Sequence, residues 1–267
     1  MQNIIITGVT RGLGLELLNY FINKHYNLIL ISKNKKQLIN LKKKFQKKGI
    51  YLHVYVVDLS KINNLKNIVN KILIKFKKID ILINNAGIWG PIGNFEKTIW
   101  SEWIEAININ LIASVYLIRA VLPSMKKNNF GRIIQLSGGG ATAPMPNFSS
   151  YAVSKTGIVR FVESMAEECR NFNISINAVA PGAMNTRMLD IALKSGRTKV
   201  GVHYNKLLKQ KKDGGVGFDR AVGLIDFLII NGKISGKLIS AIWDPWDKKN
   251  FFKKLKDKDI YTLRRKL

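Results

Sequence analysis

Two side chains in the second half of the sequence have the types and the spacing of an acid/base pair. Tyr151 stands four residues before Lys155 in the run SSYAVSK. On a helix, residues at this spacing lie on the same face, roughly 6 Å apart at the backbone. A phenol titrates near ~10, so a proton donor or acceptor that works close to neutral pH needs its pKa lowered by roughly three units. An ammonium ~4 Å away, at an effective dielectric constant of ~20, stabilises the ionised phenol by about 4 kcal/mol. At about 1.4 kcal/mol per pKa unit, this is nearly enough for the required lowering of the pKa.

A glycine-rich turn stands near the start of the chain. The run TGVTRGLG, from Thr7 to Gly14, follows the first apolar segment and opens the first helical pattern. Glycines there allow a tight turn and the close approach of a pyrophosphate to a helix N-terminus, whose free N–H groups and dipole favour anions. An ordinary glycine-rich turn is the alternative, but the strand before it and the helix after it favour nucleotide binding.

Short apolar segments alternate with longer amphipathic ones along the whole chain. The predicted strands are Ile4–Thr7, Leu28–Ser32, Leu52–Val57, Ile81–Asn84, Ile133–Ser137, Ile174–Ala180 and Lys237–Ala241. The predicted helices are Leu13–Lys24, Lys35–Lys47, Leu65–Phe76, Trp100–Lys126, Ser150–Asn171 and Asp219–Ile230. This repeat predicts an α/β fold, a doubly wound parallel sheet of about seven strands flanked by helices.

Ligands of such sheets bind beyond the carboxyl ends of the strands. The residues in that position are Gly8–Gly14, Ser32–Asn34, Asp58–Ser60, Asn85–Gly87, Ser137–Gly140 and Pro181–Thr186. Residues 183–217 break the alternation with several glycines and a weak helical pattern, and we interpret them as a mobile lid over the substrate. In a C-terminal extension, residues 243–267, Trp243 and Trp246 either close the substrate pocket or pack the C-terminus.

Length and composition exclude several kinds of site. The 267 residues predict a single domain, 1–267, and the one cysteine excludes an internal disulfide. Three scattered histidines form no ligand cluster, so no metal is expected. The first apolar run is too short for a cleavable signal, and charges interrupt the later ones, so we expect no membrane span and a cytoplasmic location.

The formal net charge of +27 would ordinarily suggest nucleic acid as a partner. The excess comes mostly from lysines spread over many segments, and aromatic residues are not interleaved with the basic runs. We therefore interpret the charge as a compositional bias on solvated helix faces and expect no nucleic-acid partner.

Taken together, the motifs resemble the short-chain dehydrogenase/reductase family of the classical type, over nearly the whole chain. TGVTRGLG looks like its cofactor turn, Asn84-Asn85-Ala86-Gly87 like its NNAG signature, and Asn110 like its helix asparagine. Tyr151 and Lys155 look like its YxxxK pair, and Pro181-Gly182 with Thr186 like its cofactor-closing segment. The resemblance implies a Rossmann-like, NAD(P)-binding oxidoreductase that moves a hydride between the cofactor and a carbonyl or secondary alcohol.

The resemblance also implies roles for individual residues. Tyr151 exchanges a proton with the substrate oxygen, while Lys155 lowers the pKa of Tyr151 and holds the nicotinamide ribose. Asn110 positions a water that links Lys155 to solvent, or else it is a polar residue that bends its helix. Asp58 hydrogen-bonds the adenine. The implied cofactor-binding residues are Thr7, Gly8, Thr10, Arg11, Gly12, Leu13, Gly14, Ser32, Lys33, Asp58, Leu59, Asn85, Ala86, Gly87, Tyr151, Lys155, Pro181, Gly182 and Thr186.

Charge at the end of the second strand predicts the cofactor. An acidic residue there would accept from the ribose 2′-hydroxyl and repel a 2′-phosphate. This chain has Ser32, Lys33 and Asn34 instead, with Arg11 in the glycine turn. NADP(H) is therefore favoured over NAD(H), unless Lys33 is simply one more lysine in a lysine-rich chain.

The sequence departs from the family at the catalytic serine, whose usual position falls on Gly138 in QLSGGGA. Ser137 stands one residue early, and a shift of one residue on a strand normally aims a side chain at the opposite face. The three consecutive glycines relax that constraint, so Ser137 stays a catalytic candidate, with Thr142, Ser149 or a backbone N–H as alternatives. Losing one preorganised donor costs about 3 to 4 kcal/mol, or on the order of a hundred- to a thousandfold in rate.

Two hypotheses follow for the whole protein. The first is an NADP(H)-dependent reductase or dehydrogenase acting on a small carbonyl or alcohol, which the basic lid suggests is anionic or sugar-like. The second is a catalytically weak cofactor-binding sensor or scaffold of the same fold, which Gly138 motivates. By resemblance, the helices at 100–126 and 150–171 imply a homodimer or homotetramer.

Overall fold

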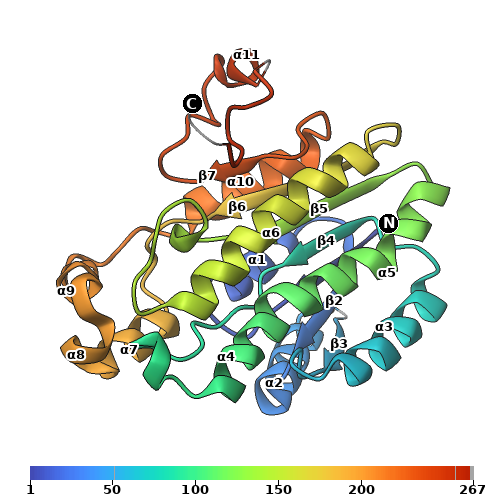
Figure 1. Ribbon diagram of the computed structural model, residues 1–267. Helices are drawn as coiled ribbons and strands as arrows, with labels where there is room; N and C mark the ends of the chain where they lie inside the picture. Colours follow the sequence, from blue (N-terminus) through green and yellow to red (C-terminus); the bar gives the residue numbers. More distant parts are fainter. Residues whose placement is uncertain (51, 256, 265–267) are drawn as a thin grey trace.

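One parallel sheet of seven strands forms the centre of the protein (Figure 1). The structure is a computed structural model and describes residues 1–50, 52–255 and 257–264. The strands are β1 (Gln2–Thr7), β2 (Tyr26–Ser32), β3 (His53–Val56), β4 (Ile81–Asn84), β5 (Gly131–Leu136), β6 (Ile174–Ala180) and β7 (Leu238–Ser240). Their order, β3-β2-β1-β4-β5-β6-β7, reverses between β1 and β4. The predicted doubly wound sheet is confirmed, and this reversal is the switch point where such sheets bind ligands.

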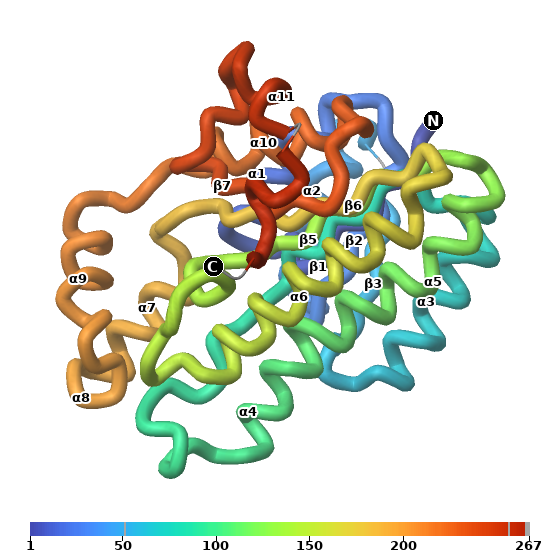
Figure 2. Tube along the Cα trace, turned by 45° about the horizontal axis from the view of Figure 1, so that its top comes forward, coloured from blue at the N-terminus to red at the C-terminus, as the bar shows by residue number. Residues whose placement is uncertain are grey.

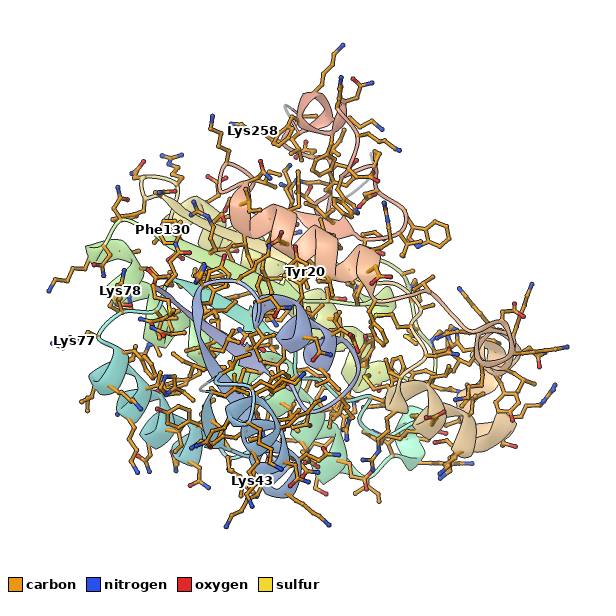
Figure 3. The ribbon with its side chains drawn as sticks, turned by 180° about the vertical axis from the view of Figure 1, so that it is seen from behind. Tyr20, Lys43, Lys77, Lys78, Phe130 and Lys258 are labelled. Carbon is orange, nitrogen blue, oxygen red and sulfur yellow. The ribbon has the colours of Figure 1, made fainter. Side chains whose placement is uncertain are left out.

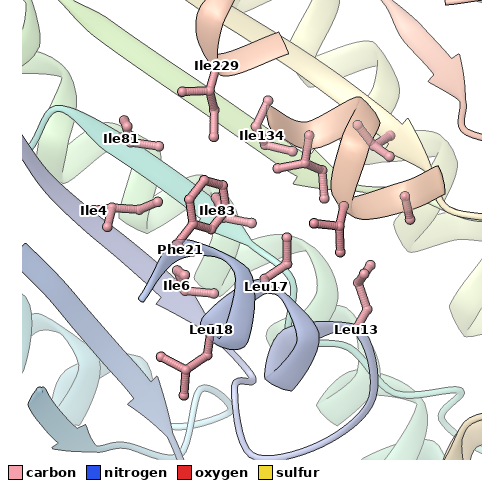
Figure 4. Packing of buried hydrophobic residues seen from close by; sticks show 14 of the residues in the cluster. Ile4, Ile6, Leu13, Leu17, Leu18, Phe21, Ile81, Ile83, Ile134 and Ile229 are labelled. Atoms are coloured by element: carbon pink, nitrogen blue, oxygen red, sulfur yellow. The ribbon is translucent and has the colours of Figure 1, made fainter. Parts of the chain in front are cut away.

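Helices cover both faces of the sheet. The elements on one face are α1 (Gly12–Phe21), α2 (Lys35–Gln46) and α10 (Asp219–Ile230), and those on the other are α3 (Ile62–Phe76), α5 (Ala113–Lys127) and α6 (Ser149–Glu168) (Figure 2). Successive residues of β1 serve opposite faces: Ile4 and Ile6 join the first cluster and Ile5 the second. Figure 4 shows Leu17 and Phe21 of α1 packed in the first cluster.

The predicted helix at 100–126 is interrupted. It consists of α4 (Trp100–Ile107), a π-helical segment η2 (Asn108–Ile112) and α5. Among the described residues, the continuous run Trp100–Lys127 is the one stretch long and apolar enough, by length and composition, to cross a membrane. Because α5 packs between α3 and β5, that apolar character fits a core helix.

The predicted lid contains three helices where the sequence suggests one weak helix. These are α7 (Arg187–Lys194), α8 (Gly196–Val200) and α9 (Tyr204–Asp213), which project beyond the sheet (Figure 1, orange). Leu189, Ala192 and Val200 are buried within it. An antiparallel bridge between Met184 and Gly215 joins the two ends. The lid is therefore a compact excursion from the carboxyl edge of the sheet.

The C-terminal extension folds back onto the sheet. The extension contains the short helix α11 (Phe251–Lys254). The segment after this helix is held by Lys237, whose ammonium donates to the carbonyls of Lys258 at 2.9 Å and Ile260 at 2.8 Å. Of the two tryptophans, Trp246 donates to the Ala241 carbonyl at 3.0 Å, whereas Trp243 is 85% exposed at the mouth of the cleft described below. Trp246 thus packs the C-terminal segment and Trp243 borders the cleft.

Most lysines lie on the outer surface, whereas Lys155 and Lys237 are buried. Figure 3 shows Lys43, Lys77, Lys78 and Lys258 projecting outward from different elements. This arrangement fits the interpretation of the +27 charge as solvated helix faces.

Candidate active site

A cleft of about 990 Å³ lies beyond the carboxyl ends of the strands. Residues that follow β1, β2, β3, β4, β5 and β6 line it, as do the lid and the C-terminal segment. Its position is the one that the strand pattern predicts. Among the described residues, no group of three or more His, Cys, Asp or Glu side chains could hold a metal ion.

The glycine turn and the segment after β4 form one tightly packed unit. A Cβ on Gly14 would overlap the Gly8 carbonyl and lie 2.6 Å from the Asn85 amide nitrogen. Asn85 Nδ2 donates to the carbonyls of Thr7 at 3.0 Å and Gly8 at 3.2 Å. Thr7 Oγ1 accepts from the N–H groups of Asn85 and Ala86, both at 3.0 Å. Thr7 is buried and does not line the cleft, and its hydrogen bonds position the turn.

Positive charge gathers at the end of the cleft near β2. Lys33 lines this end, and the hydroxyls of Thr10 and Ser32 lie 3.5 Å apart. Burial and the charge of Arg187, at the start of the lid, both lower the pKa of Arg11. Two guanidinium groups therefore share the mouth of the cleft, which favours an anionic ligand.

Asp58 stands at the same end with its carboxylate stabilised. Burial raises the pKa of this carboxyl, but hydrogen bonds from the Ser60 N–H at 2.9 Å and hydroxyl at 2.8 Å, with the charges of Lys33 and Lys61, outweigh burial. The net effect is a lowered pKa. Asp58 is therefore an ionised acceptor that lines the cleft, with its side chain fixed by Ser60.

Tyr151 and Lys155 lie in the first two turns of α6, and both are buried, with 8% and 4% of their surface exposed. Lys155 Nζ donates to the Leu136 carbonyl at 2.8 Å and lies 5.5 Å from the centroid of the Tyr151 ring. Burial lowers the pKa of Lys155 to about 8 and raises the pKa of Tyr151. Burial thus opposes the expected lowering of the phenol pKa by the lysine, because it penalises both charged forms.

Gly138 makes room for the phenol. A Cβ on Gly138 would overlap Tyr151 Oη and lie 3.0 Å from Cζ of the same ring. Ser137 is buried, and its hydroxyl donates to the Lys155 carbonyl at 3.5 Å. The hydroxyl of Ser137 is thus engaged with the main chain of α6, which gives its predicted catalytic role no support.

Asn110 lies in the π-helical segment and is fully buried. Its Oδ1 accepts from the Ile88 N–H at 2.9 Å, and its Nδ2 donates to the Ile88 carbonyl at 2.9 Å and to Ser154 Oγ at 3.0 Å. A Cβ on Gly87 would lie 3.3 Å from Asn110 Oδ1 and 3.5 Å from Lys155 Nζ. Asn110 therefore interrupts its helix and also stands beside Lys155, although it does not itself line the cleft. Such π-helical turns are frequent at functional sites.

Large apolar side chains form the wall of the cleft around Tyr151. The Trp89 ring lies 4.4 Å from the Tyr151 ring and 5.0 Å from the Phe148 ring, centroid to centroid. The Trp89 indole N–H donates to the Met188 carbonyl of the lid at 2.7 Å. His203, also from the lid, lies edge-on to Phe148, and its Nε2 is buried with no hydrogen-bond partner among the described residues.

Comparison with known proteins places this site in a family. The profile of the family described as short chain dehydrogenase matches residues 2–195. The chain belongs to the short-chain dehydrogenase family. It is 31% identical over 181 residues to "Oxidoreductase BOA17" of Botryotinia fuckeliana, covering 68% of this chain and 65% of that protein. It is 32% identical over 187 residues to "3-oxoacyl-[acyl-carrier-protein] reductase FabG" of Haemophilus influenzae, covering 70% of this chain and 76% of that protein.

A solved structure of NAD⁺-bound xylitol dehydrogenase has the same fold. It superposes with a TM-score of 0.79 at 22% identity and covers 90% of this chain and 96% of its own. The chain spans less than two thirds of the Botryotinia protein, at 65%. The comparisons therefore establish the oxidoreductase family and its fold.

Most of the residues predicted for the short-chain dehydrogenase site lie together in the cleft. Of the predicted set, Thr7 and Asn110 do not line it. Among the cleft residues that sequence reasoning missed are Trp89, Arg187 and His203. Trp89 stands two residues after the NNAG run, and Arg187 directly follows Thr186. Their positions next to predicted cofactor-binding residues indicate a place in the cleft. His203 lies in the irregular lid, and no motif marks it.

Proposed function

We propose that this short-chain dehydrogenase reduces a carbonyl, with NADP(H) as cofactor and Tyr151 as proton donor. The observation that carries the proposal is the meeting of Tyr151 and Lys155 at the end of β5, in the same cleft as the glycine turn. Burial raises the pKa of Tyr151, so the phenol carries, at neutral pH, the proton that reduction transfers to the substrate oxygen.

The residues of the glycine turn fit a dinucleotide. Arg11, the N-cap of α1, makes no side-chain capping bond, so the first turn of α1 offers its N–H groups to a pyrophosphate. Pro181, Gly182 and Thr186 line the same cleft, and a Cβ on Gly12 would lie 3.5 Å from Thr186 Cγ2. A nicotinamide cofactor held there supplies the hydride. Lys155 lies where it could hold the nicotinamide ribose, and Asp58 where it could meet the adenine.

Charge supports NADP(H) over NAD(H). Lys33 and Arg11 line the end of the cleft beside the short side chain of Ser32. An anionic 2′-phosphate gains from both cations, and no acidic residue follows β2 to repel it. Asp58 is the nearby carboxylate, and Lys33 compensates its charge.

The substrate that this cleft suits best carries apolar groups beside its carbonyl. Trp89, Met145, Met188 and Leu207 line the wall around Tyr151. Of the basic residues of the lid, Arg187 and Lys206 line the cleft, whereas Lys194, Lys209 and Lys211 are exposed and do not. Arg187 and Lys206 therefore support an anionic group on the substrate as well. His203 also lines the cleft, and its buried Nε2 has no hydrogen-bond partner among the described residues.

Exposed apolar side chains support the proposed homodimer or homotetramer. Phe95 and Ile99, just before α4, are exposed, as are Trp100 at the start of α4, Ile112 at the end of η2 and Val153 on α6. Apolar patches of this kind mark protein interfaces. Sedimentation of the purified chain would give its oligomeric state.

NADPH consumption against a panel of aryl and alkyl ketones tests the proposal. We expect Tyr151→Phe to lower kcat by roughly 10² to 10⁴ because it removes the transferred proton. Tyr204→Phe is a matched control, since Tyr204 packs near the same wall but does not line the cleft. Full turnover by Tyr151→Phe would refute the assigned mechanism.

One observation favours the alternative of a catalytically weak cofactor-binding protein. Tyr151 and Lys155 are both buried in ways that disfavour their charged forms, and residue 138 supplies no hydroxyl. This alternative predicts tight NADPH binding without turnover on any ketone of the panel. Calorimetric titration of NADPH, run beside the activity assay, separates the two functions.

A further inference from the structure

The Tyr151 phenol is bounded by Trp89, which lies outside the family motifs, and by Gly138, where the catalytic serine of the family usually stands. Trp89 covers its ring at 4.4 Å between centroids. At the hydroxyl end, Gly138 leaves the space into which Tyr151 Oη extends, because a Cβ there would overlap that oxygen. The position of the phenol therefore depends on a large residue at 89 and on the absence of a side chain at 138.

The need for glycine at position 138 is steric. Its φ of 178° is extended backbone that any residue adopts, so no left-handed conformation requires glycine there. Tyr151 cannot simply yield to a new side chain, because it is buried and Trp89 lies against its ring. A side chain at 138 and Trp89 in its present place compete for the position of one phenol.

Trp89 is itself held on three sides. Its carbonyl accepts from Ser150 Oγ at 3.2 Å, one residue before Tyr151. Its neighbour Ile88 exchanges two hydrogen bonds with the Asn110 side chain. Its indole N–H donates to the Met188 carbonyl of α7 at 2.7 Å. One side chain thus contacts both the proposed proton donor and the lid.

We propose that Trp89 is a positioning residue for the proton donor. Its ring holds the Tyr151 phenol in the space that Gly138 leaves open, and its indole N–H ties the lid to that ring. This inference rests on the proposed function of Tyr151. It explains why the serine hydroxyl expected at residue 138 is missing: the phenol occupies the place of its Cβ.

A double-mutant cycle between positions 89 and 138 tests the proposal. With Trp89 in place, we expect Gly138→Ser to lower kcat at least roughly tenfold and the unfolding midpoint by roughly 2 to 8 °C, as overpacking does. In a Trp89→Ala background the same serine has room, because the phenol can shift. The double variant should then exceed the Gly138→Ser single variant in both kcat and midpoint.

Trp89→Phe separates the two contacts of the tryptophan. A phenylalanine keeps a ring against Tyr151 and loses the donor to Met188. We expect the KM for the ketone to rise several-fold while kcat stays within about twofold of the parent. Trp103→Phe is the matched control. The Trp103 indole N–H donates to Ser149, which lies on α6 as Tyr151 does, and Trp103 does not line the cleft. It should change neither constant.

Two results would overturn the proposal. One is a gain in kcat from Gly138→Ser with Trp89 present, and the other is strict additivity of the two changes in the unfolding midpoint. The unfolding midpoints are measured without any substrate. If the parent protein reduces no ketone, the proposed function fails, whereas the pairing of Trp89 with Gly138 is still decided by stability.

Discussion

On the cofactor side of the cleft, short polar side chains bond to main-chain atoms of the neighbouring turn, whereas on the substrate side the contacts run between large side chains from distant segments. Asn85 donates to the carbonyls of Thr7 and Gly8, which fixes the glycine turn. Trp89, Phe148 and His203 come from three separate segments and meet by their rings. The first side has little freedom for substitution, and the second can be repacked to suit a different substrate.

The largest expected effect is that of Gly14→Ala. A methyl group there overlaps the Gly8 carbonyl, and main chain cannot move aside as a side chain can. We expect measurable NADPH binding to be abolished and the unfolding midpoint to fall. Titration of NADPH checks the first and calorimetry the second.

Gly139→Ala is the control on the other side of the cleft. A Cβ on Gly139 meets no atom within 4 Å. NADPH affinity should stay within about twofold of the parent, since no contact is lost or strained. Equal losses in the two variants would contradict the contrast between a tight turn and an open one.

Lys155, at the boundary of the two sides, makes stability depend on pH. Its pKa is about 8 in the folded chain against 10.5 for the free group. Between these values the unfolded chain binds more protons, so the free energy of unfolding rises with pH by up to about 1.4 kcal/mol per unit, or about 3 kcal/mol in total. Below pH 8 both states bind the proton and this slope disappears.

Urea titrations from pH 7 to 11 measure this dependence. Lys155→Met should remove the pH dependence of the free energy of unfolding. Lys43→Met, at an exposed lysine, should retain it and serves as the control for the loss of one positive charge. A parallel pH dependence in the parent and in Lys155→Met would show that Lys155 is not the group responsible.

The difference between the two sides also explains how far the sequence could be interpreted. All seven strands were predicted because short apolar runs and glycine turns are local patterns. The glycine turn, Asn85 and the Tyr151–Lys155 spacing are equally local. The contact of Tyr151 with Gly138 and the three helices of the lid depend on packing between segments far apart in the chain. The raised pKa of Tyr151 depends on burial, which residue spacing does not reveal.

Cofactor preference should respond to a single charge. We expect Lys33→Asp to weaken NADPH binding roughly tenfold to a hundredfold, because a carboxylate repels the 2′-phosphate, and to leave or improve NADH binding. Lys61→Asp is the control: its charge also acts on Asp58, but Lys61 does not line the cleft. If both variants weakened NADPH equally, the total charge of the protein would be the cause.

The smallest effect is expected for His203→Phe, which tests the substrate side. Phenylalanine keeps a ring against Phe148 and removes the buried Nε2, which has no partner in the part of the chain that the structure describes. We expect kcat/KM to fall about tenfold for ketones with a hydroxyl at the end remote from the carbonyl, and to stay unchanged for wholly apolar ketones.

His53→Phe is the matched control for that substitution. His53 also lies edge-on to a phenylalanine, Phe76, but does not line the cleft. It should affect neither class of ketone. A loss with His203→Phe that is equal for both classes would mean that the ring shapes the wall without contacting a polar group of the substrate. A loss confined to the hydroxylated ketones would instead make His203 a residue that selects the substrate.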